Sequence, residues 1–209
     1  ELMIDGKPVL FYQERDPSKL PWKDLGIDVV VESSGVFTSF EKAKPHLDAG
    51  AKRVVITAPA KDEDNPSAGS GQAKTATPNV GIDFLEESKI TSNASCTTNA
   101  TTPIVSVMMK NPGIKKGLLS TVHGYTASQG IVDGPNKKDF REGRAAAQNI
   151  VPSSTGAAIA TTKAITDLAG KFDGISLRVP VVAGSVADIT FISKKPTTVL
   201  EVNEILKSA

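Results

Sequence analysis

The residue types best suited to chemistry gather around Cys96, in the segment SNASCTTN at positions 92–99. A strand is expected to end and a helix to begin here. The free N–H groups and the positive dipole end of a helix N-terminus favour the thiolate, which is the nucleophilic form of cysteine. The hydroxyls of Ser95 and Thr97 can bind an anion or cap the helix. Taken alone, the pattern also fits a small buried core cysteine flanked by capping hydroxyls.

The sequence has few other cysteines or histidines that could bind a metal or act in catalysis. Cys96 is the single cysteine, which rules out an intrachain disulfide framework and a zinc site built on several thiolates. Only two histidines are present, His46 and His123, and they leave little for an imidazole-rich metal site. We therefore expect no metal. From its strand position alone, His123 fits a structural residue better than a catalytic one.

Composition narrows the class of protein. The 209 residues carry 24 Lys+Arg and 23 Asp+Glu, so no basic footprint for nucleic acid or an anionic membrane is present. Apolar residues make up 39%, which is typical of a globular chain rather than a disordered one. Apolar runs are far shorter than the ~20 residues that span a bilayer. We expect a soluble, cytoplasmic protein of one large or two modest domains.

The first third of the chain predicts a parallel α/β unit. Residues 2–4 and 9–11 are expected to form a hairpin around the turn pair Asp5-Gly6. Strands are predicted at 27–31 and 53–57, joined by a helix from about Thr38, with Thr38 and Glu41 at capping-box spacing and Gly50 as its C′ glycine. Strand, crossover helix and strand form a right-handed unit of a parallel sheet.

The middle and the last part differ from this pattern. Residues 61–79 are polar and are interpreted as a flexible loop or insert. A short strand at 89–91 and a helix from near Cys96 follow. The later elements expected are a strand at 117–125, a functional loop at 127–144, a helix at 157–168, antiparallel strands at 175–182 and 185–193 turned at Ala183-Gly184, and a helix capped by Thr198 and Glu201. This predicts a parallel α/β part followed by an α+β part.

Several segments together resemble one family, the phosphorylating glyceraldehyde-3-phosphate dehydrogenases. Segment 92–99 matches the family's catalytic-cysteine motif residue for residue, and the similar segments occur in the family's order over nearly the whole chain. The others are ERDP (14–17) with LPW (20–22), VVESSGVF (30–37), AGAK (49–52), TAPA (57–60), TVHGYT (121–126), STGAA (154–158) and RVP (178–180).

The resemblance implies an architecture and two domains. Residues 1–95 would form the second half of a Rossmann-type NAD-binding domain, with the polar insert at 61–79. Residues 96–209 would form an incomplete catalytic domain with a mixed, largely antiparallel sheet. The family's glycine-rich phosphate loop would precede Glu1 and its nicotinamide-binding asparagine would follow Ala209, so we expect a partial chain that does not bind NAD tightly on its own.

The resemblance also assigns roles. Cys96 would attack the aldehyde of glyceraldehyde 3-phosphate, and His123 would hold the thiolate and exchange the proton. Hydride transfer to NAD would leave a thioester, which inorganic phosphate cleaves to give 1,3-bisphosphoglycerate. The phosphate-binding residues implied are Ser95, Thr97, Thr155 and Gly156 for inorganic phosphate, and Thr126 and Arg178 for the substrate phosphate. The residues assigned to inorganic phosphate could instead cap helices, and Arg178 could instead be an ordinary cation on an edge strand.

For the cofactor, the resemblance places Thr57 near the nicotinamide and Arg15 near the adenine, with NAD favoured over NADP.

The chain departs from the family pattern in the long loop. Where the family usually reads arginine-arginine-alanine-arginine, this chain has Arg141-Glu142-Gly143-Arg144. A carboxylate at Glu142 would weaken binding of the substrate phosphate unless Arg141 or Arg144 reaches in. An unchanged Michaelis constant in Glu142→Arg would count against this expectation.

Alternative functions stay open at this point. A paralogue acting on another phosphorylated aldehyde, such as erythrose 4-phosphate, would carry the same residues. A sensor or binding protein could keep a reactive Cys96 and lack turnover, for which Glu142 and the polar insert are the motivating observations. The resemblance further implies a homotetramer with the long loop at a subunit interface.

Overall fold

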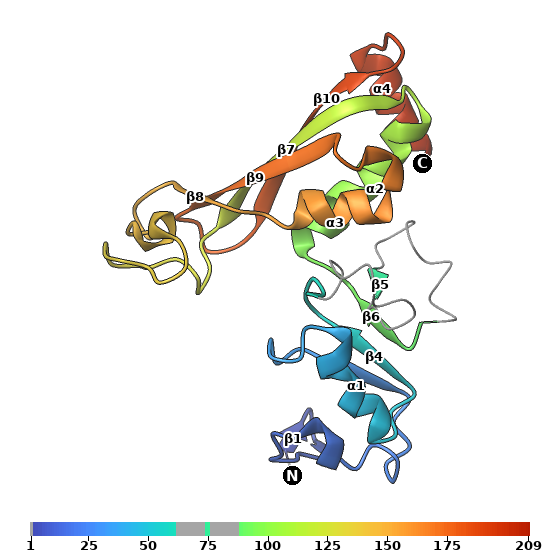
Figure 1. The fold of residues 1–209 in the computed structure, drawn as a ribbon, viewed down its shortest axis with the longest axis vertical. Helices are drawn as coiled ribbons and strands as arrows, with labels where there is room; N and C mark the ends of the chain where they lie inside the picture. The colour runs from blue at the N-terminus through green and yellow to red at the C-terminus, as the bar shows by residue number, and fades with distance from the viewer. Residues whose placement is uncertain (1, 62–73, 76–87) are drawn as a thin grey trace. The chain divides into compact units, whose positions relative to one another are not determined.

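The computed structural model describes residues 2–61, 74–75 and 88–209, and these fall into two compact units. Of the described residues, the first unit holds 2–61, Lys74 and 88–93, and the second holds Thr75 and 94–209. Both are drawn in Figure 1, and each is described by itself below. Most of the predicted polar insert at 61–79 lies outside the described residues. Its described part includes β5 (Lys74–Thr75), a paired strand rather than the loop that we predicted.

The first unit opens with the predicted hairpin. Strand β1 (Leu2–Ile4) pairs antiparallel with β2 (Lys7–Val9). The turn residues Asp5 and Gly6 have φ of 49° and 73°, the two positive values that a type I′ turn requires. The hairpin and its turn are confirmed, but the second strand covers Lys7–Val9 and not the predicted residues 9–11. A short 3-10 helix, η1 (Pro17–Lys19), follows.

The predicted parallel sheet is the centre of this unit. Its strand order is β3-β4-β6-β5, in which β3 (Val29–Glu32), β4 (Arg53–Ile56) and β6 (Ile90–Ser92) run parallel. Helix α1 (Phe40–Asp48) crosses from β3 to β4. Val54, Ile56 and Ile90 are fully buried here, whereas Val29 and Val31 of β3 are exposed, so the side chains of one sheet face form the core. The strand–helix–strand prediction is confirmed.

The start of α1 corrects one sequence prediction. Its N-cap is Ser39, whose hydroxyl accepts the Lys42 N–H at 3.4 Å, and not Thr38. Thr38 is buried, and its hydroxyl has no hydrogen-bond partner among the residues that the structure describes. Serine caps at least as well as threonine. With the helix starting one residue later, Lys42 instead of Glu41 takes the third position, so no carboxylate returns to complete a capping box.

A glycine is required at position 50, both by the positive φ of its backbone and by the close approach of Lys23. It follows the C-cap of α1 with φ of +108°, and a Cβ there would lie 2.5 Å from the Lys23 Cβ. We expect Gly50→Ala to lower the free energy of unfolding of this unit by about 2–5 kcal/mol. Gly26→Ala is the matched control, because Gly26 also has positive φ (+62°) but open space around a Cβ, and only the conformational cost of about 1–2 kcal/mol applies. Urea unfolding followed by Trp22 fluorescence measures both; equal losses would contradict the close contact.

The second unit is built on a mixed four-stranded sheet of order β10-β7-β9-β8 (Figure 1). Strand β7 (Ile114–Gly124) pairs antiparallel with β10 (Ser185–Ser193) and parallel with β9 (Phe172–Val179). Strand β8 (Val151–Ser153), which the sequence analysis missed, pairs antiparallel with β9. A mixed, largely antiparallel sheet was expected and is found.

One predicted pairing is wrong. Strands β9 and β10 run in opposite directions, as predicted, but they are not neighbours, because the long strand β7 lies between them. The connection at 180–184 spans two interstrand distances of about 4.8 Å, well within the reach of five residues at about 3.3 Å each. Gly184, with φ of +92°, turns the chain into β10. A short connection therefore did not imply a hairpin.

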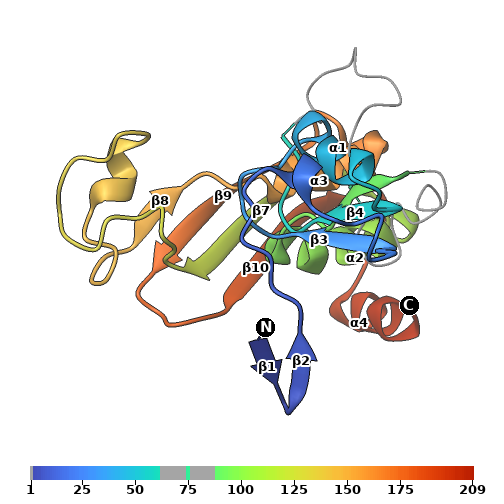
Figure 2. The ribbon, with the colours of Figure 1, turned by 90° about the horizontal axis from the view of Figure 1, so that it is seen from below.

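Helices cover one face of this sheet. Helix α2 (Cys96–Lys110) and helix α3 (Ala157–Ala164), followed by the 3-10 helix η4 (Thr166–Leu168), contribute Val105, Met108, Ala158 and Leu168 to a core against Leu119 and Phe172. Figure 2 shows the same elements from below. Helix α4 (Val199–Ser208) has the predicted capping box of Thr198 and Glu201.

Candidate active site

Helix α2 presents Cys96 at its first helical position. Ser95 is the N-cap, and its hydroxyl accepts the Thr98 N–H at 3.1 Å. Asn99 donates its side-chain amide to the Ser95 carbonyl at 2.9 Å, which adds a second tie across the first turn. Ala94 enters this turn with φ of 58°, a conformation uncommon for a residue with a Cβ. Cys96 is exposed at the free N–H end of the helix, where a thiolate is favoured.

Strand β7 brings His123 to the same place. His123 is the penultimate residue of the strand and is half-buried. Its Nε2 lies 3.5 Å from the Cys96 Sγ, so a proton can pass directly between imidazole and thiol. Twenty-seven residues separate the two in sequence, and the packing of α2 on the sheet brings them together.

Arg178 is the third member of this group. In the parallel pair β7–β9 its Cα partner is His123, so the two side chains are neighbours on one face of the sheet. The Arg178 Nη1 lies 2.7 Å from the His123 Nδ1, and that same Nδ1 lies 2.6 Å from the Gly124 carbonyl oxygen. The Arg178 Nε is buried and has no partner among the described residues.

The hydroxyls expected to hold inorganic phosphate are partly engaged. Ser95 caps α2, and Thr97 is buried with its hydroxyl 3.8 Å from the Cys96 Sγ. Thr155 accepts the Ala157 N–H at 3.2 Å, although the N-cap of α3 is Gly156. Helices α2 and α3 are tied by a hydrogen bond of 2.9 Å between the hydroxyls of two buried threonines, Thr102 and Thr161.

Thr126 is held by a residue that the sequence analysis did not name. Both the N–H and the hydroxyl of Thr126 donate to the Gln129 Oε1, at 2.9 and 3.1 Å. Gln129 is buried and also donates to the Ser128 hydroxyl. In the described part of the chain, no hydrogen bond joins Thr126 to Cys96, His123 or Arg178. A glutamine in a polar stretch carries no sequence signal for this role.

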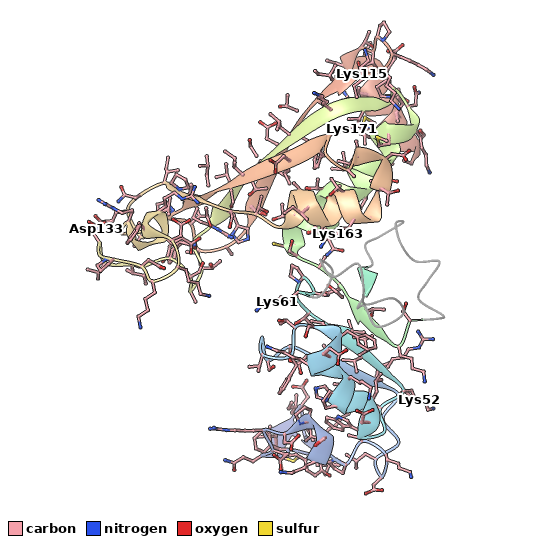
Figure 3. The ribbon with its side chains drawn as sticks, viewed as in Figure 1. Lys52, Lys61, Lys115, Asp133, Lys163 and Lys171 are labelled. Atoms are coloured by element: carbon pink, nitrogen blue, oxygen red, sulfur yellow. The ribbon has the colours of Figure 1, made fainter. Side chains whose placement is uncertain are left out.

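The long loop engages its charged residues internally. Arg141 pairs with Asp139 at 2.6 Å, and Arg144 pairs with Asp133 at 2.8 Å. Figure 3 labels Asp133 on this loop. The hydrogen bonds from Arg141 hold the pKa of Asp139 below its ordinary value. Glu142, within the 3-10 helix η3 (Phe140–Gly143), accepts a hydrogen bond from the Ser153 hydroxyl on β8. Both arginines therefore already have an anionic partner in this loop.

The two residues expected near the cofactor belong to the first unit. Thr57 directly follows β4, and its hydroxyl donates to the Glu32 carbonyl at 3.3 Å. Arg15 is exposed in the segment before η1. Ligands of open α/β sheets bind outside the carboxyl ends of the strands, which is where Thr57 and the turn at Gly35 lie. A Cβ at Gly35 would meet no atom within 4 Å, so the backbone of this turn is accessible.

The chain thus combines a parallel α/β unit with a mixed-sheet unit in which a helix-terminal cysteine lies beside a histidine, the arrangement that covalent cysteine catalysis requires. The family model described as "Glyceraldehyde 3-phosphate dehydrogenase, C-terminal domain" matches residues 95–209, and the model of the NAD binding domain of the same enzyme matches residues 1–40. The chain belongs to the glyceraldehyde-3-phosphate dehydrogenase family.

Similar curated proteins carry that name. The chain is 48% identical over 209 residues to glyceraldehyde-3-phosphate dehydrogenase 1 of Trichoderma koningii, and 48% identical over 208 residues to the enzyme of Ogataea parapolymorpha. It is also 48% identical over 209 residues to the enzyme of Neurospora crassa. Each comparison covers 100% of this chain and 59% of the relative.

Proposed function

We propose that this chain is part of a glycolytic dehydrogenase that oxidises glyceraldehyde 3-phosphate with NAD and inorganic phosphate to 1,3-bisphosphoglycerate. The observation that supports it best is the 3.5 Å approach of the Cys96 Sγ to the His123 Nε2 at an exposed helix N-terminus. Membership of the family supplies the reaction class, and a nucleophile–base pair in hydrogen-bond reach is what that reaction requires.

In the proposed mechanism, the Cys96 thiolate adds to the aldehyde carbon to form a hemithioacetal. His123 accepts the hydroxyl proton as the carbon is oxidised to a thioester. When bound, NAD supplies the acceptor for the hydride that leaves this carbon. Phosphate then displaces the Cys96 thiolate, and the acyl phosphate keeps oxidation energy that hydrolysis would release as heat. An exposed thiol allows both substrates to reach the sulfur.

Two phosphate-binding regions accompany this chemistry in the proposal. Ser95, Thr97, Thr155 and Gly156 would hold inorganic phosphate, and Thr126 and Arg178 would hold the substrate phosphate. The buried, unpartnered Arg178 Nε supports the second assignment, because a guanidinium with a free donor suits a phosphate oxygen. The first assignment has weaker support, since Ser95 and Thr155 also serve their own helix starts.

We also propose that the two compact units are the cofactor and catalytic domains, with Thr57 and Arg15 on the cofactor side. A homo-oligomer, a tetramer in the family, is supported by an apolar sheet face that the helices leave uncovered. That face exposes Leu118, Val122, Ile175, Val186 and Ile192. Faces of this kind mark interaction sites. No helix in the described ranges is long and apolar enough to cross a membrane; a cytoplasmic location stays a prediction.

The test adds glyceraldehyde 3-phosphate, NAD and inorganic phosphate to the whole dehydrogenase of which this chain is part, and records NADH formation together with acylation of Cys96. A burst of NADH equal to the acylated Cys96, followed by turnover that depends on phosphate, is the expected result. Rapid loss of Cys96 to iodoacetamide without any NADH would favour the sensor. A higher rate with erythrose 4-phosphate than with the triose would favour the paralogue.

A further inference from the structure

The His123 Nδ1 has two neighbours that require opposite protonation states of this nitrogen. The Arg178 Nη1, at 2.7 Å, is a donor and needs a lone pair on Nδ1. The Gly124 carbonyl oxygen, at 2.6 Å, is an acceptor and needs a proton on Nδ1. A ring nitrogen offers one or the other at any moment. Arginine is always protonated, so while its guanidinium stays in place Nδ1 carries no proton.

The protonation of Nδ1 determines whether Nε2 faces Cys96 as a hydrogen-bond donor or as an acceptor. If Nδ1 accepts from Arg178, the single proton of the neutral ring lies on Nε2, which then faces the Cys96 Sγ as a donor. In that state Nε2 has no lone pair with which to take a proton. If Nδ1 instead donates to the Gly124 carbonyl, Nε2 is free to accept a proton from sulfur or from a hydroxyl formed there.

Arg178 is poorly satisfied where it stands, so an anion can draw it away. Among residues 2–61, 74–75 and 88–209, no carboxylate forms an ion pair with Arg178, and its buried Nε has no partner. The cations of the nearby long loop, Arg141 and Arg144, are already paired. A phosphate group would satisfy several guanidinium donors at once, which a single ring nitrogen does not.

We propose that Arg178 is a positioning residue that keeps the His123 Nδ1 unprotonated until a phosphate group engages the guanidinium, and that His123 becomes a base toward Cys96 only then. The proposal rests on the proposed function for the source of the phosphate group, which is a phosphomonoester or free phosphate. It couples substrate occupancy to proton acceptance through one side chain. Without a bound phosphate group, His123 faces the sulfur only as a donor.

The test is ¹⁵N NMR of the full 209-residue chain labelled at histidine, which reports the protonation of each ring nitrogen. Without added anion, His123 is expected as the tautomer with its proton on Nε2. Glycerol 3-phosphate, a phosphomonoester without an aldehyde, should move the proton to Nδ1; a parallel titration with inorganic phosphate shows which source acts. A proton on Nδ1 before any addition, or an Nδ1 that neither anion protonates, would overturn the proposal.

Variants and an internal control complete the experiment. Arg178→Leu should show a protonated Nδ1 without anion and no further change on addition, whereas Arg178→Lys, which keeps a cationic donor, should retain the Nε2–H tautomer. His46 accepts from the Trp22 indole and faces Glu32, so its signals should not move in any sample. The readout needs neither NAD nor turnover. An absence of NADH would therefore count against the proposed function and leave this proposal standing.

Discussion

Replacing His123 by asparagine is expected to slow the acylation of Cys96 by between about 10² and 10⁴-fold, the usual contribution of a positioned general base. The reason is the direct 3.5 Å approach of the His123 Nε2 to the Cys96 Sγ. Asparagine keeps a polar side chain of similar reach but has no nitrogen that accepts a proton. The thiol then loses the group that takes its proton.

The measurement does not require the cofactor. Glycerol 3-phosphate is added so that it engages Arg178 and leaves the His123 Nε2 free to accept a proton. A chromogenic ester such as p-nitrophenyl acetate then acylates the thiol and releases p-nitrophenolate, which gives the rate on the 209-residue chain. Cys96→Ala sets the background, because it removes the nucleophile while keeping His123. Circular dichroism establishes that the variants are folded. A rate for His123→Asn within a factor of three of the wild type would show that the histidine is structural, the alternative that the residue pattern alone left open.

Local sequence signals predicted most of the elements. The Asp5-Gly6 turn, the parallel pair β3–β4 and the Thr198 capping box each depend on a few adjacent residues, and all three are confirmed. The errors have another origin. The neighbours of β9 and β10 are decided by β7, about 50 residues earlier in the chain, and the short strand β8 has no apolar run of its own. Pairing over such distances leaves no local pattern.

The site shows the same division. Cys96 at the start of α2 follows from the strand-to-helix pattern, and the family resemblance supplied His123 and Arg178. The contact between Arg178 and His123 depends on the parallel register of β7 and β9, which the sequence does not state. The role of Gln129 at Thr126 is likewise set by the conformation of a loop. The sequence therefore named residues that the structure brings together, but it did not predict their hydrogen-bond partners.

A second large effect is expected in the first unit, at a buried chain of polar groups. The indole N–H of Trp22 donates to the His46 Nδ1 at 3.1 Å, and the His46 Nε2 lies 3.0 Å from the Glu32 Oε2. Both members of the His46–Glu32 pair have side chains only 6% exposed. The other oxygen of Glu32 accepts the N–H of Ser34, at 2.8 Å, and its hydroxyl.

Each donor in this hydrogen-bond network determines whether the next group must donate or accept. Indole can only donate, so the His46 Nδ1 must accept, and the single proton of the neutral ring must lie on Nε2. The group opposite Nε2 must then be an acceptor, while the other oxygen of Glu32 is already needed by Ser34. Only a carboxylate offers two acceptor oxygens in this geometry. Glutamine has one carbonyl oxygen, so Glu32→Gln leaves a buried donor facing an amide N–H.

We therefore expect Glu32→Gln to lower the free energy of unfolding of this unit by about 1–3 kcal/mol, and Glu32→Ala by about 3–5 kcal/mol, because alanine leaves every donor unpaired. Lys52, whose pairing with Asp28 is exposed, supplies the control: Lys52→Gln should change stability by less than about 1 kcal/mol. Urea unfolding monitored by far-UV circular dichroism suits all variants, including those at Trp22.

If Trp22 sets the tautomer of His46, substitutions at Trp22 and Glu32 should not be additive in their effect on stability. In Trp22→Phe the indole donor of the half-buried Trp22 is gone, and the His46 ring can hold its proton on Nδ1. The His46 Nε2 is then an acceptor, which the amide of Glu32→Gln can satisfy. The double variant should thus lose less stability than the sum of the two single losses, by about 0.5–3 kcal/mol, the range found for residues that share one network. Strict additivity would mean that Trp22 does not set the tautomer of His46, and the chain of donors and acceptors proposed for this core would be wrong.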